Sequence, residues 1–214
     1  MSKINILCLG AHHDDIELGC GGSALRWSQQ GNNVYSLVLT ESTFTNPDGK
    51  VVRNLSDVNK ESSLAAEILG IRTVECPEPV KVFELRNNEQ IRCQILNVIK
   101  QYDIDTLLFP WDGDPHKDHS ELGQASLMCG KSLPRLLMYK IEFHCGSRPF
   151  NPSIYVDISD CFEKKLEALK VYRSEFERSG VKWEKWLRNK NRTDGIRMGV
   201  EYAEAFQAVR YLLP

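Results

Sequence analysis

Four of the five histidines in this 214-residue chain fall into two short segments that also carry aspartates. His12 and His13 lie in AHHDDIELG, and His116 and His119 lie in DGDPHKDHSELG. Imidazole nitrogens and carboxylate oxygens suit a zinc-like ion, and three protein ligands with an open fourth position are typical of a catalytic site. The residue types therefore predict a metal site built from both segments.

The spacing within each segment supports this prediction. His12 and Asp15 are three residues apart, as are His116 and His119, and this spacing places both side chains on one side of a helical turn. A single polar residue after a strand is more often a cap or a satisfied loop residue, and Asp118 could cap the helix that follows it. Capping does not explain the whole set, because clustered carboxylates repel one another without a cation.

The elements before the two segments predict that the segments meet. Residues 4–11 and 105–111 are short, continuous apolar runs, as expected of strands buried on both faces. Each histidine segment directly follows one of these runs. In an open parallel sheet the strands' carboxyl ends share one edge, and such folds bind ligands there.

Strands and helices alternate along the rest of the chain. Further strands are expected at residues 34–40, near Val74, at 136–143 and at 154–158. Helices are expected at residues 24–30, 56–69, 91–99, 120–129 and 161–179, the second capped by Ser56 or Asp57 and ended by Gly70. The polar loop at 46–49 allows a hairpin, and the tail after 179 gives a mixed pattern. This alternation predicts one domain, residues 1–214, with a Rossmann-like three-layer α/β fold and a mostly parallel sheet.

The composition argues against several functional classes. Lys and Arg number 27 against 29 Asp and Glu, giving a net charge of −2 and no basic surplus for nucleic-acid binding. No apolar run approaches the roughly 18 residues of a membrane span, and the first residues lack a signal-peptide pattern, so we expect a cytoplasmic protein. The seven cysteines are odd in number and form no Cys-x-x-Cys, so we interpret them as reduced packing residues.

Other conspicuous residues have structural interpretations. The segment Gly19-Cys20-Gly21-Gly22 lacks the G-x-G-x-x-G spacing, which favours close packing of a loop against a helix over a dinucleotide site. Tryptophans at helical spacing are more often core residues than a sugar-facing wall, and we interpret Trp27, Trp183 and Trp186 in that way. We also interpret the fifth histidine, His144, as structural.

At the level of motifs the chain resembles a known family. AHHDDIELGCGG is similar to the AHPDD signature of the PIG-L/LmbE-like zinc deacetylases of N-acetylated sugars, and HKDH at 116–119 resembles their HxDH signature. The blocks KESSLAAEILGI, DTLLFPW, NPSIYVDIS with KKLEALKVYRSEF, and GVEYAEAF extend the likeness along nearly the whole chain. The resemblance implies a hydrolase that removes an acetyl group from a small N-acetylated sugar or sugar conjugate.

The resemblance also implies roles for individual residues. The implied zinc ligands are His12, Asp15 and His119. Asp14 is implied as the general base, His116 as the group that stabilises the oxyanion, and Asp118 as the residue that orients His116. General chemistry agrees, because zinc lowers the pKa of its bound water toward about 7 and a cationic His116 would hold negative charge. Fe²⁺ or another divalent ion could use the same ligands.

The chain departs from the family pattern at three positions. His13 and Lys117 stand where the family commonly has proline, and neither takes a role from the resemblance. An arginine that many members place three residues before the glutamate matched by Glu61 corresponds to Val58 here. That arginine is associated with gripping the sugar, so we consider Arg53 as a substitute substrate-binding residue.

Two other functions remain open on the sequence alone. Asp112, Asp114 and His116 would also suit a two-metal phosphoesterase, although the further histidine and asparagine clusters of such a site are missing. A non-catalytic sugar-binding protein could keep a metal for structure. One bound ion favours the deacetylase, two favour the phosphoesterase, and four protein ligands would favour the binding protein.

Overall fold

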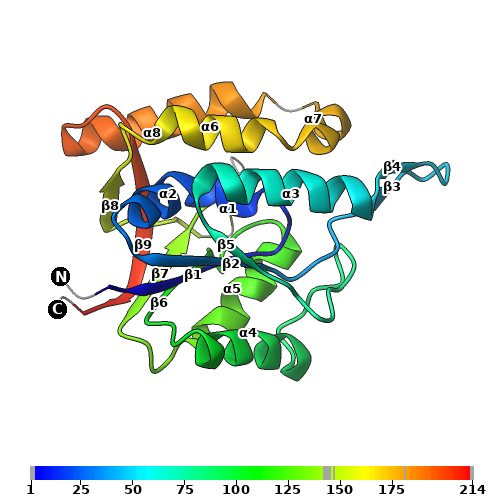
Figure 1. Ribbon diagram of the computed structural model, residues 1–214, viewed down its shortest axis with the longest axis horizontal. Helices are drawn as coiled ribbons and strands as arrows, with labels where there is room; N and C mark the ends of the chain where they lie inside the picture. The colour runs from blue at the N-terminus through cyan, green and yellow to red at the C-terminus, as the bar shows by residue number, and fades with distance from the viewer. Residues whose placement is uncertain (1–2, 142–145, 147, 181, 213–214) are drawn as a thin grey trace.

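A seven-stranded sheet forms the centre of the computed structural model, which describes residues 3–141, 146, 148–180 and 182–212. The strands follow the order β5-β2-β1-β6-β7-β9-β8, and the first five are parallel while β9 runs antiparallel to both of its neighbours. Their bounds are β1 Asn5–Gly10, β2 Asn33–Val38, β5 Arg72–Val74, β6 Thr106–Pro110, β7 Arg135–Tyr139, β8 Ile154–Asp157 and β9 Ala203–Tyr211. A separate short hairpin consists of β3 Phe44–Thr45 and β4 Val51–Arg53, and it projects from the body of the molecule (Figure 1).

Helices cover both faces of this sheet (Figure 1). On one side lie α4 Glu89–Gln101 and α5 Lys117–Cys129; on the other lie α1 Asp15–Gly19, α2 Gly21–Gln29 and α3 Leu55–Leu69. Outside α1–α3 run α6 Phe162–Lys170, α7 Arg173–Ser179 and α8 Trp183–Met198. The predicted α/β fold with a mostly parallel sheet is confirmed. None of the described helices is both long enough and apolar enough to pass through a membrane.

The buried strands have a core on each side. Along β1, Ile6 and Cys8 join the cluster under α1–α3 and α6, whereas Leu7 and Leu9 join the cluster under α4 and α5. Alternate residues of a strand point to opposite faces, so a strand buried on both faces needs the continuous apolar run seen here. The six described cysteines are free, as expected.

Two glycines near the junction of α1 and α2 are explained by packing. A Cβ atom on Gly19 would lie 2.0 Å from the ring of Tyr139, and one on Gly22 would lie 2.9 Å from Ile158. Only glycine lets α1 and α2 approach the sheet and the loop after β8 this closely. The packing interpretation is confirmed for Gly19 and Gly22, but not for Gly21, whose Cβ would meet its neighbours at an ordinary 3.4 Å or more.

Several expected boundaries were wrong. The helix expected at 161–179 is two helices, and between them the buried Tyr172 donates its hydroxyl to Glu17 at 3.2 Å. Asn54, not Ser56 or Asp57, caps α3, because its side chain accepts the backbone N–H of Asp57. The mixed tail forms α8 and β9. His144 and the end of the strand expected at 136–143 lie outside the described residues.

Candidate functional site

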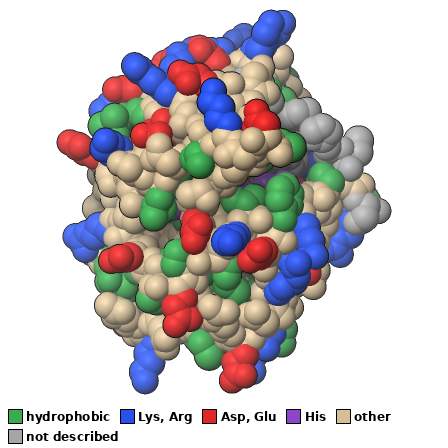
Figure 2. Space-filling model, turned by 90° about the vertical axis from the view of Figure 1, so that its right-hand side faces the viewer, with side chains coloured by type: hydrophobic (Ala, Val, Ile, Leu, Met, Phe, Trp, Pro, Cys, Tyr) green, Lys and Arg blue, Asp and Glu red, His purple; other side chains and the backbone are tan. Residues whose placement is uncertain are grey.

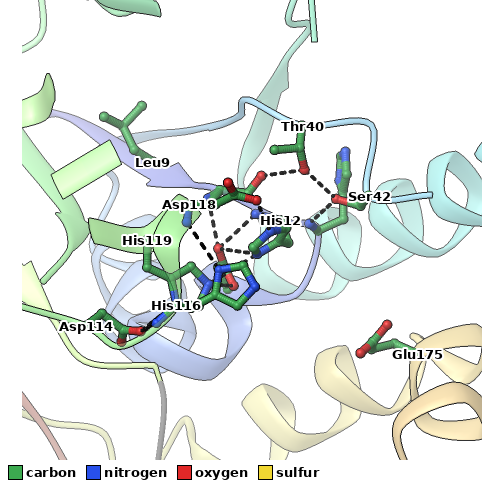
Figure 3. Close-up of polar contacts among 12 residues, drawn as sticks. Leu9, His12, Thr40, Ser42, Asp114, His116, Asp118, His119 and Glu175 are labelled. Atoms are coloured by element: carbon green, nitrogen blue, oxygen red, sulfur yellow. Dashed lines mark hydrogen bonds and ion pairs between the residues drawn. The ribbon is translucent and has the colours of Figure 1, made fainter. Parts of the chain in front are cut away.

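The two histidine segments meet at the carboxyl edge of the sheet, as predicted. Strands β1 and β6 are parallel neighbours, so the loops after Gly10 and after Pro110 leave the sheet side by side. The ring nitrogens His12 Nδ1 and His119 Nε2 are 3.2 Å apart, although the residues are 107 positions apart in the chain (Figure 3). Strand order therefore accounts for the convergence.

The donor atoms at this meeting point fit a small metal ion. Asp15 Oδ1 lies 3.1 Å from His119 Nε2, and Asp15 Oδ2 lies 3.5 Å from His12 Nδ1. Tetrahedral ligands about 2.0–2.1 Å from zinc are separated by about 3.3 Å. The two ring nitrogens and the Asp15 carboxylate could thus form one face of a tetrahedron. A ring nitrogen of His116 also lies nearby. One ring nitrogen from each of the three histidines lies within 4.8 Å of those from the other two.

In His12 and His119, the ring nitrogen on the side away from Asp15 contacts a carboxylate. His12 Nε2 lies 3.1 Å from Asp118 Oδ2, and His119 Nδ1 lies 3.1 Å from Asp114 Oδ1. A carboxylate on one ring nitrogen fixes the proton there and leaves the other nitrogen available as a metal ligand. Both histidines are thereby oriented with their other ring nitrogens toward Asp15.

The charges at the site favour a cation. Burial alone would lower the pKa of His12, but Asp15 and Asp118 raise it to about 9. Burial alone would raise the pKa of Asp15, but His119 and His12 hold it well below its usual range. The Asp15 carboxylate also accepts the backbone N–H groups of Ala11 and His12, both at 2.8 Å. These carboxylates therefore stabilise positive charge. In the metal-free protein, protons on the histidines provide that charge, and a bound divalent ion could provide it instead.

Asp14 lies beside this donor set but outside it. Its backbone has φ 140°, a strained value for a residue with a Cβ, just before α1 begins at Asp15. Burial raises the pKa of Asp14 well above its usual range, and the charges of Glu175 and Asp15 add to the effect. A raised pKa makes a carboxylate a stronger proton acceptor, which suits the role of general base.

His116 differs from its expected state. It is the N-cap of α5, and its Nδ1 accepts the backbone N–H of Asp118 at 3.3 Å. Burial lowers the pKa of His116 to about 4, and the charges of His119 and His12 act in the same direction. The ring is therefore neutral rather than cationic, with its hydrogen on Nε2. Asp118 contacts the His116 ring only through its backbone N–H. The helix begins at Lys117, so the Asp118 carboxylate points toward His12 instead.

His13 and Arg53 support the loop from outside the donor set. The His13 backbone donates to Ser42 Oγ at 2.9 Å and accepts from Arg53 at 3.0 Å. The His13 ring contacts Ser62 Oγ, and burial followed by the charge of Arg53 lowers its pKa to about 4. Arg53 is only 3% exposed and also donates to Ser174 and Glu175. Its guanidinium holds the peptide next to Asp14 and lines the cavity described next.

A cavity of about 260 Å³ opens above the histidines. His12, Asp14, His116 and His119 all line it. Histidine is visible in a cleft that hydrophobic side chains border (Figure 2). Among the described residues, four besides glycine have positive φ, and three of these, Asp14, Ser42 and Phe83, line this cavity. Such backbone strain often concentrates at functional sites.

Sequence reasoning missed three residues of this region. Asp114 was considered only for a phosphoesterase, although a carboxylate five residues before His119 could have been tested as its partner. Phe83 lies at the cavity through a loop without a recognisable pattern, and its backbone donates to Asp118 at 2.7 Å. Glu175 belongs to α7, whose separation from α6 was not predicted. No local pattern in the sequence predicts that Phe83 or Glu175 lies at the cavity.

Comparison with known proteins gives consistent matches. The family model described as PIG-L, GlcNAc-PI de-N-acetylase, matches residues 7–129. The diacetylchitobiose deacetylase of Thermococcus kodakarensis is 27% identical over 223 residues, covering 95% of this chain and 82% of that protein. The uncharacterised deacetylase YaiS of Escherichia coli is 32% identical over 176 residues, covering 79% of this chain and 90% of that protein.

A solved structure agrees with these matches. The conserved protein TT1542 of Thermus thermophilus superposes with a TM-score of 0.79 at 25% identity, covering 99% of this chain and 97% of that one. The family model spans more than half of the chain and includes both histidine segments. Together with the signatures and the geometry of the site, these matches show that the chain belongs to the PIG-L family of de-N-acetylases.

Proposed function

We propose that this protein is a metal-dependent hydrolase that removes the acetyl group from an N-acetylated sugar or sugar conjugate. The observation that carries the proposal is the donor set of His12, Asp15 and His119, which lies beside Asp14 and His116 at one cavity. The diacetylchitobiose deacetylase among the relatives supports the choice of a sugar amide as substrate.

Three side chains would hold the metal, namely His12 through Nδ1, His119 through Nε2 and Asp15 through its carboxylate. Zinc is the first candidate and Fe²⁺ the second, because two imidazoles and a carboxylate suit both. When bound, the ion would act as a Lewis acid that lowers the pKa of water and polarises the amide carbonyl. Asp114 and Asp118 would keep the two imidazoles in the ligating orientation.

Asp14 would move the protons of the reaction. As general base its carboxylate takes a proton from the attacking water, while the water oxygen bonds to the acetyl carbon. When the carbon–nitrogen bond breaks, Asp14 returns that proton to the departing nitrogen. The products are acetate and the free amino sugar, so one water is consumed for each amide hydrolysed.

His116 would stabilise the negative charge that develops on the carbonyl oxygen. Its Nδ1 accepts the Asp118 backbone N–H, so the neutral ring carries its hydrogen on Nε2 and can donate from there. A fixed donor aimed at a developing oxyanion is effective because it needs no reorganisation during the reaction. A neutral His116 can therefore fill the proposed role without the positive charge expected from the sequence.

Arg53 is proposed to contribute to substrate binding in place of the family arginine, whose position Val58 occupies here. It lines the cavity, and its contacts with His13, Ser174 and Glu175 fix its position there. Direct binding predicts that Arg53→Met raises KM for the sugar. If Arg53 only holds the Asp14 loop in place, the same variant should lower kcat and leave KM unchanged.

The rival functions predict different results. In a phosphoesterase with two ions, Asp114 would be a ligand, but its Oδ1 contacts the far nitrogen of His119 and the backbone N–H of His116. This arrangement favours one ion for each chain. A non-catalytic sugar-binding protein would bind N-acetylated sugars and release no amine.

The proposal is tested by measuring amine release from N-acetylated sugars, sugar phosphates and nucleotide sugars with zinc-loaded protein. Asp14→Asn keeps the size of the side chain but removes the base. We expect its turnover to fall by about 10²-fold or more while its metal content stays unchanged. Unchanged turnover of this variant would refute the role of Asp14, and no amine release by the parent protein on any of these substrates would refute the function.

A further inference from the structure

One aromatic ring at the cavity is largely exposed. Phe83 lines the cavity, and 57% of its surface is exposed. Its ring stacks on His116 with centroids 5.1 Å apart and an interplanar angle of 20°. Two other aromatic residues line the cavity, but Arg178 covers the ring of Phe44 at 4.6 Å and Trp183 is only 8% exposed. Phe83 is therefore the ring with most surface available to a ligand.

The backbone fixes this ring relative to the catalytic residues. Phe83 has φ 68°, a left-handed conformation that is costly for a bulky side chain and persists only where its surroundings enforce it. Its N–H donates to Asp118 Oδ2 at 2.7 Å, and the same oxygen contacts His12 Nε2 at 3.1 Å. One carboxylate thus ties the position of the Phe83 loop to a proposed metal ligand.

We propose that Phe83 determines specificity for a sugar ring. The exposed surface of the Phe83 ring packs against the C–H face of the pyranose, beside His116, so that the acetamido group of the sugar can reach the catalytic residues. This inference rests on the proposed function, whose substrate it specifies as a cyclic N-acetylated sugar. Pyranoses present carbon-bound hydrogens on one face, and aromatic rings bind such surfaces through dispersion and weak C–H contacts.

The rest of the cavity is consistent with this orientation. Polar groups capable of binding hydroxyls also line the cavity, among them Arg178, which pairs with Glu175, and the hydroxyl of Ser42. Ligand sites commonly combine an apolar wall with a few placed polar groups. A single exposed aromatic residue is otherwise ordinary on a protein surface, so the inference depends on the stacking and on the fixed backbone.

Direct binding measurements test the inference without requiring turnover. Zinc-loaded Asp14→Asn protein, which retains the cavity, is titrated with N-acetylglucosamine and with the acyclic amide N-acetylethanolamine. The same titrations are made after adding Phe83→Leu, which keeps an apolar side chain without the ring, or Phe83→Tyr, which restores the ring. All variants keep the backbone N–H, so their zinc content should equal that of the parent.

We expect Phe83→Leu to weaken binding of N-acetylglucosamine by about three- to tenfold, Phe83→Tyr to retain the parent affinity, and neither to alter binding of the acyclic amide. Equal sugar affinity with and without the ring, an equal loss for both ligands, or no binding of the sugar by the parent would overturn the inference. Phe83→Gly, which suits the positive φ, serves the same comparison if the leucine variant does not fold.

Failure of this inference can be told apart from failure of the proposed function. If the protein with its native Asp14 releases amine but the Phe83→Leu variant binds the sugar normally, only the inference is wrong. If the sugar binds in a ring-dependent way and no amine is released, the function is wrong and the inference holds for a sugar-binding site.

Discussion

The two proposed ligand histidines would bind the metal through different nitrogens, and the reason lies in their carboxylate partners. Asp118 faces Nε2 of His12, so Nδ1 is directed toward the donor set, whereas Asp114 faces Nδ1 of His119 and leaves Nε2 available. The choice of nitrogen is thus decided by residues that would not touch the ion.

Asp114→Ala tests the importance of such a partner. The variant removes the acceptor for His119 Nδ1, and loss of such partners typically costs about 10–100-fold in metal affinity. Competition with a chromogenic chelator measures the affinity. Asp48→Ala, at the exposed turn of the β3–β4 hairpin, is the control and should bind metal like the parent. An unchanged affinity in Asp114→Ala would mean that His119 does not need this contact.

Residue types and order predicted which loops meet, but not every side-chain contact. His12, Asp15 and His119 converge because the order of parallel strands brings their loops to one edge. The partner of the Asp118 carboxylate could not be predicted, since it depends on α5 starting at Lys117 rather than near residue 120. The neutral state of His116 depends on burial, which becomes measurable only in the folded structure.

At the scale of elements, the short helix α1 connects the site to the core. It begins at Asp15 and ends at Gly19, which packs against the ring of Tyr139 on β7. The position of the Asp15 carboxylate therefore depends on how closely the end of α1 approaches the sheet.

Gly19→Ala should be strongly destabilising, because its methyl group would overlap a buried aromatic ring that has no room to move. We expect a loss of about 2 kcal/mol or more in the free energy of unfolding, measured by urea denaturation. Gly21→Ala is the matched control, since its Cβ would meet neighbours at an ordinary 3.4 Å. Similar stability of the two variants would show that α1 can shift away from the sheet.

Most strands and helices followed from local patterns, and the exceptions have physical reasons. The polar helix α8 buries few apolar side chains, so its sequence lacks a clear helical stripe. Strand β9 is buried only in its first half, and it lies between β7 and β8 through pairings with residues far away in the chain. Pairings of this kind are not encoded in any local window of sequence.

At the scale of the molecule, a buried ion pair joins four elements. Lys165 on α6 contacts Glu204 on β9 at 2.5 Å, and both side chains are fully buried. Glu204 accepts the backbone N–H groups of Gly22 and Ser23 at the start of α2, while Lys165 donates to the carbonyl of Leu18 at 3.2 Å. The pair thus ties the outer helices to the layer that carries α1.

Breaking this pair should cost more than breaking a surface pair. Lys165→Met leaves the Glu204 carboxylate buried without its counterion, which typically costs about 3–5 kcal/mol. Lys170→Met is the matched control, because Lys170 and Glu184 are largely exposed and such pairs contribute about 1 kcal/mol or less. Chemical denaturation of both variants measures the difference, and equal losses would contradict this account.

Metal content measured for each chain tests the central claim most directly. Protein incubated with excess zinc, passed over a desalting column and analysed by mass spectrometry for elements should retain one ion per chain. Asp14→Asn should retain the same amount, whereas Asp15→Ala should retain little, since it removes a ligand. Two ions in the parent, or a full ion in Asp15→Ala, would contradict a single site formed by the two loops.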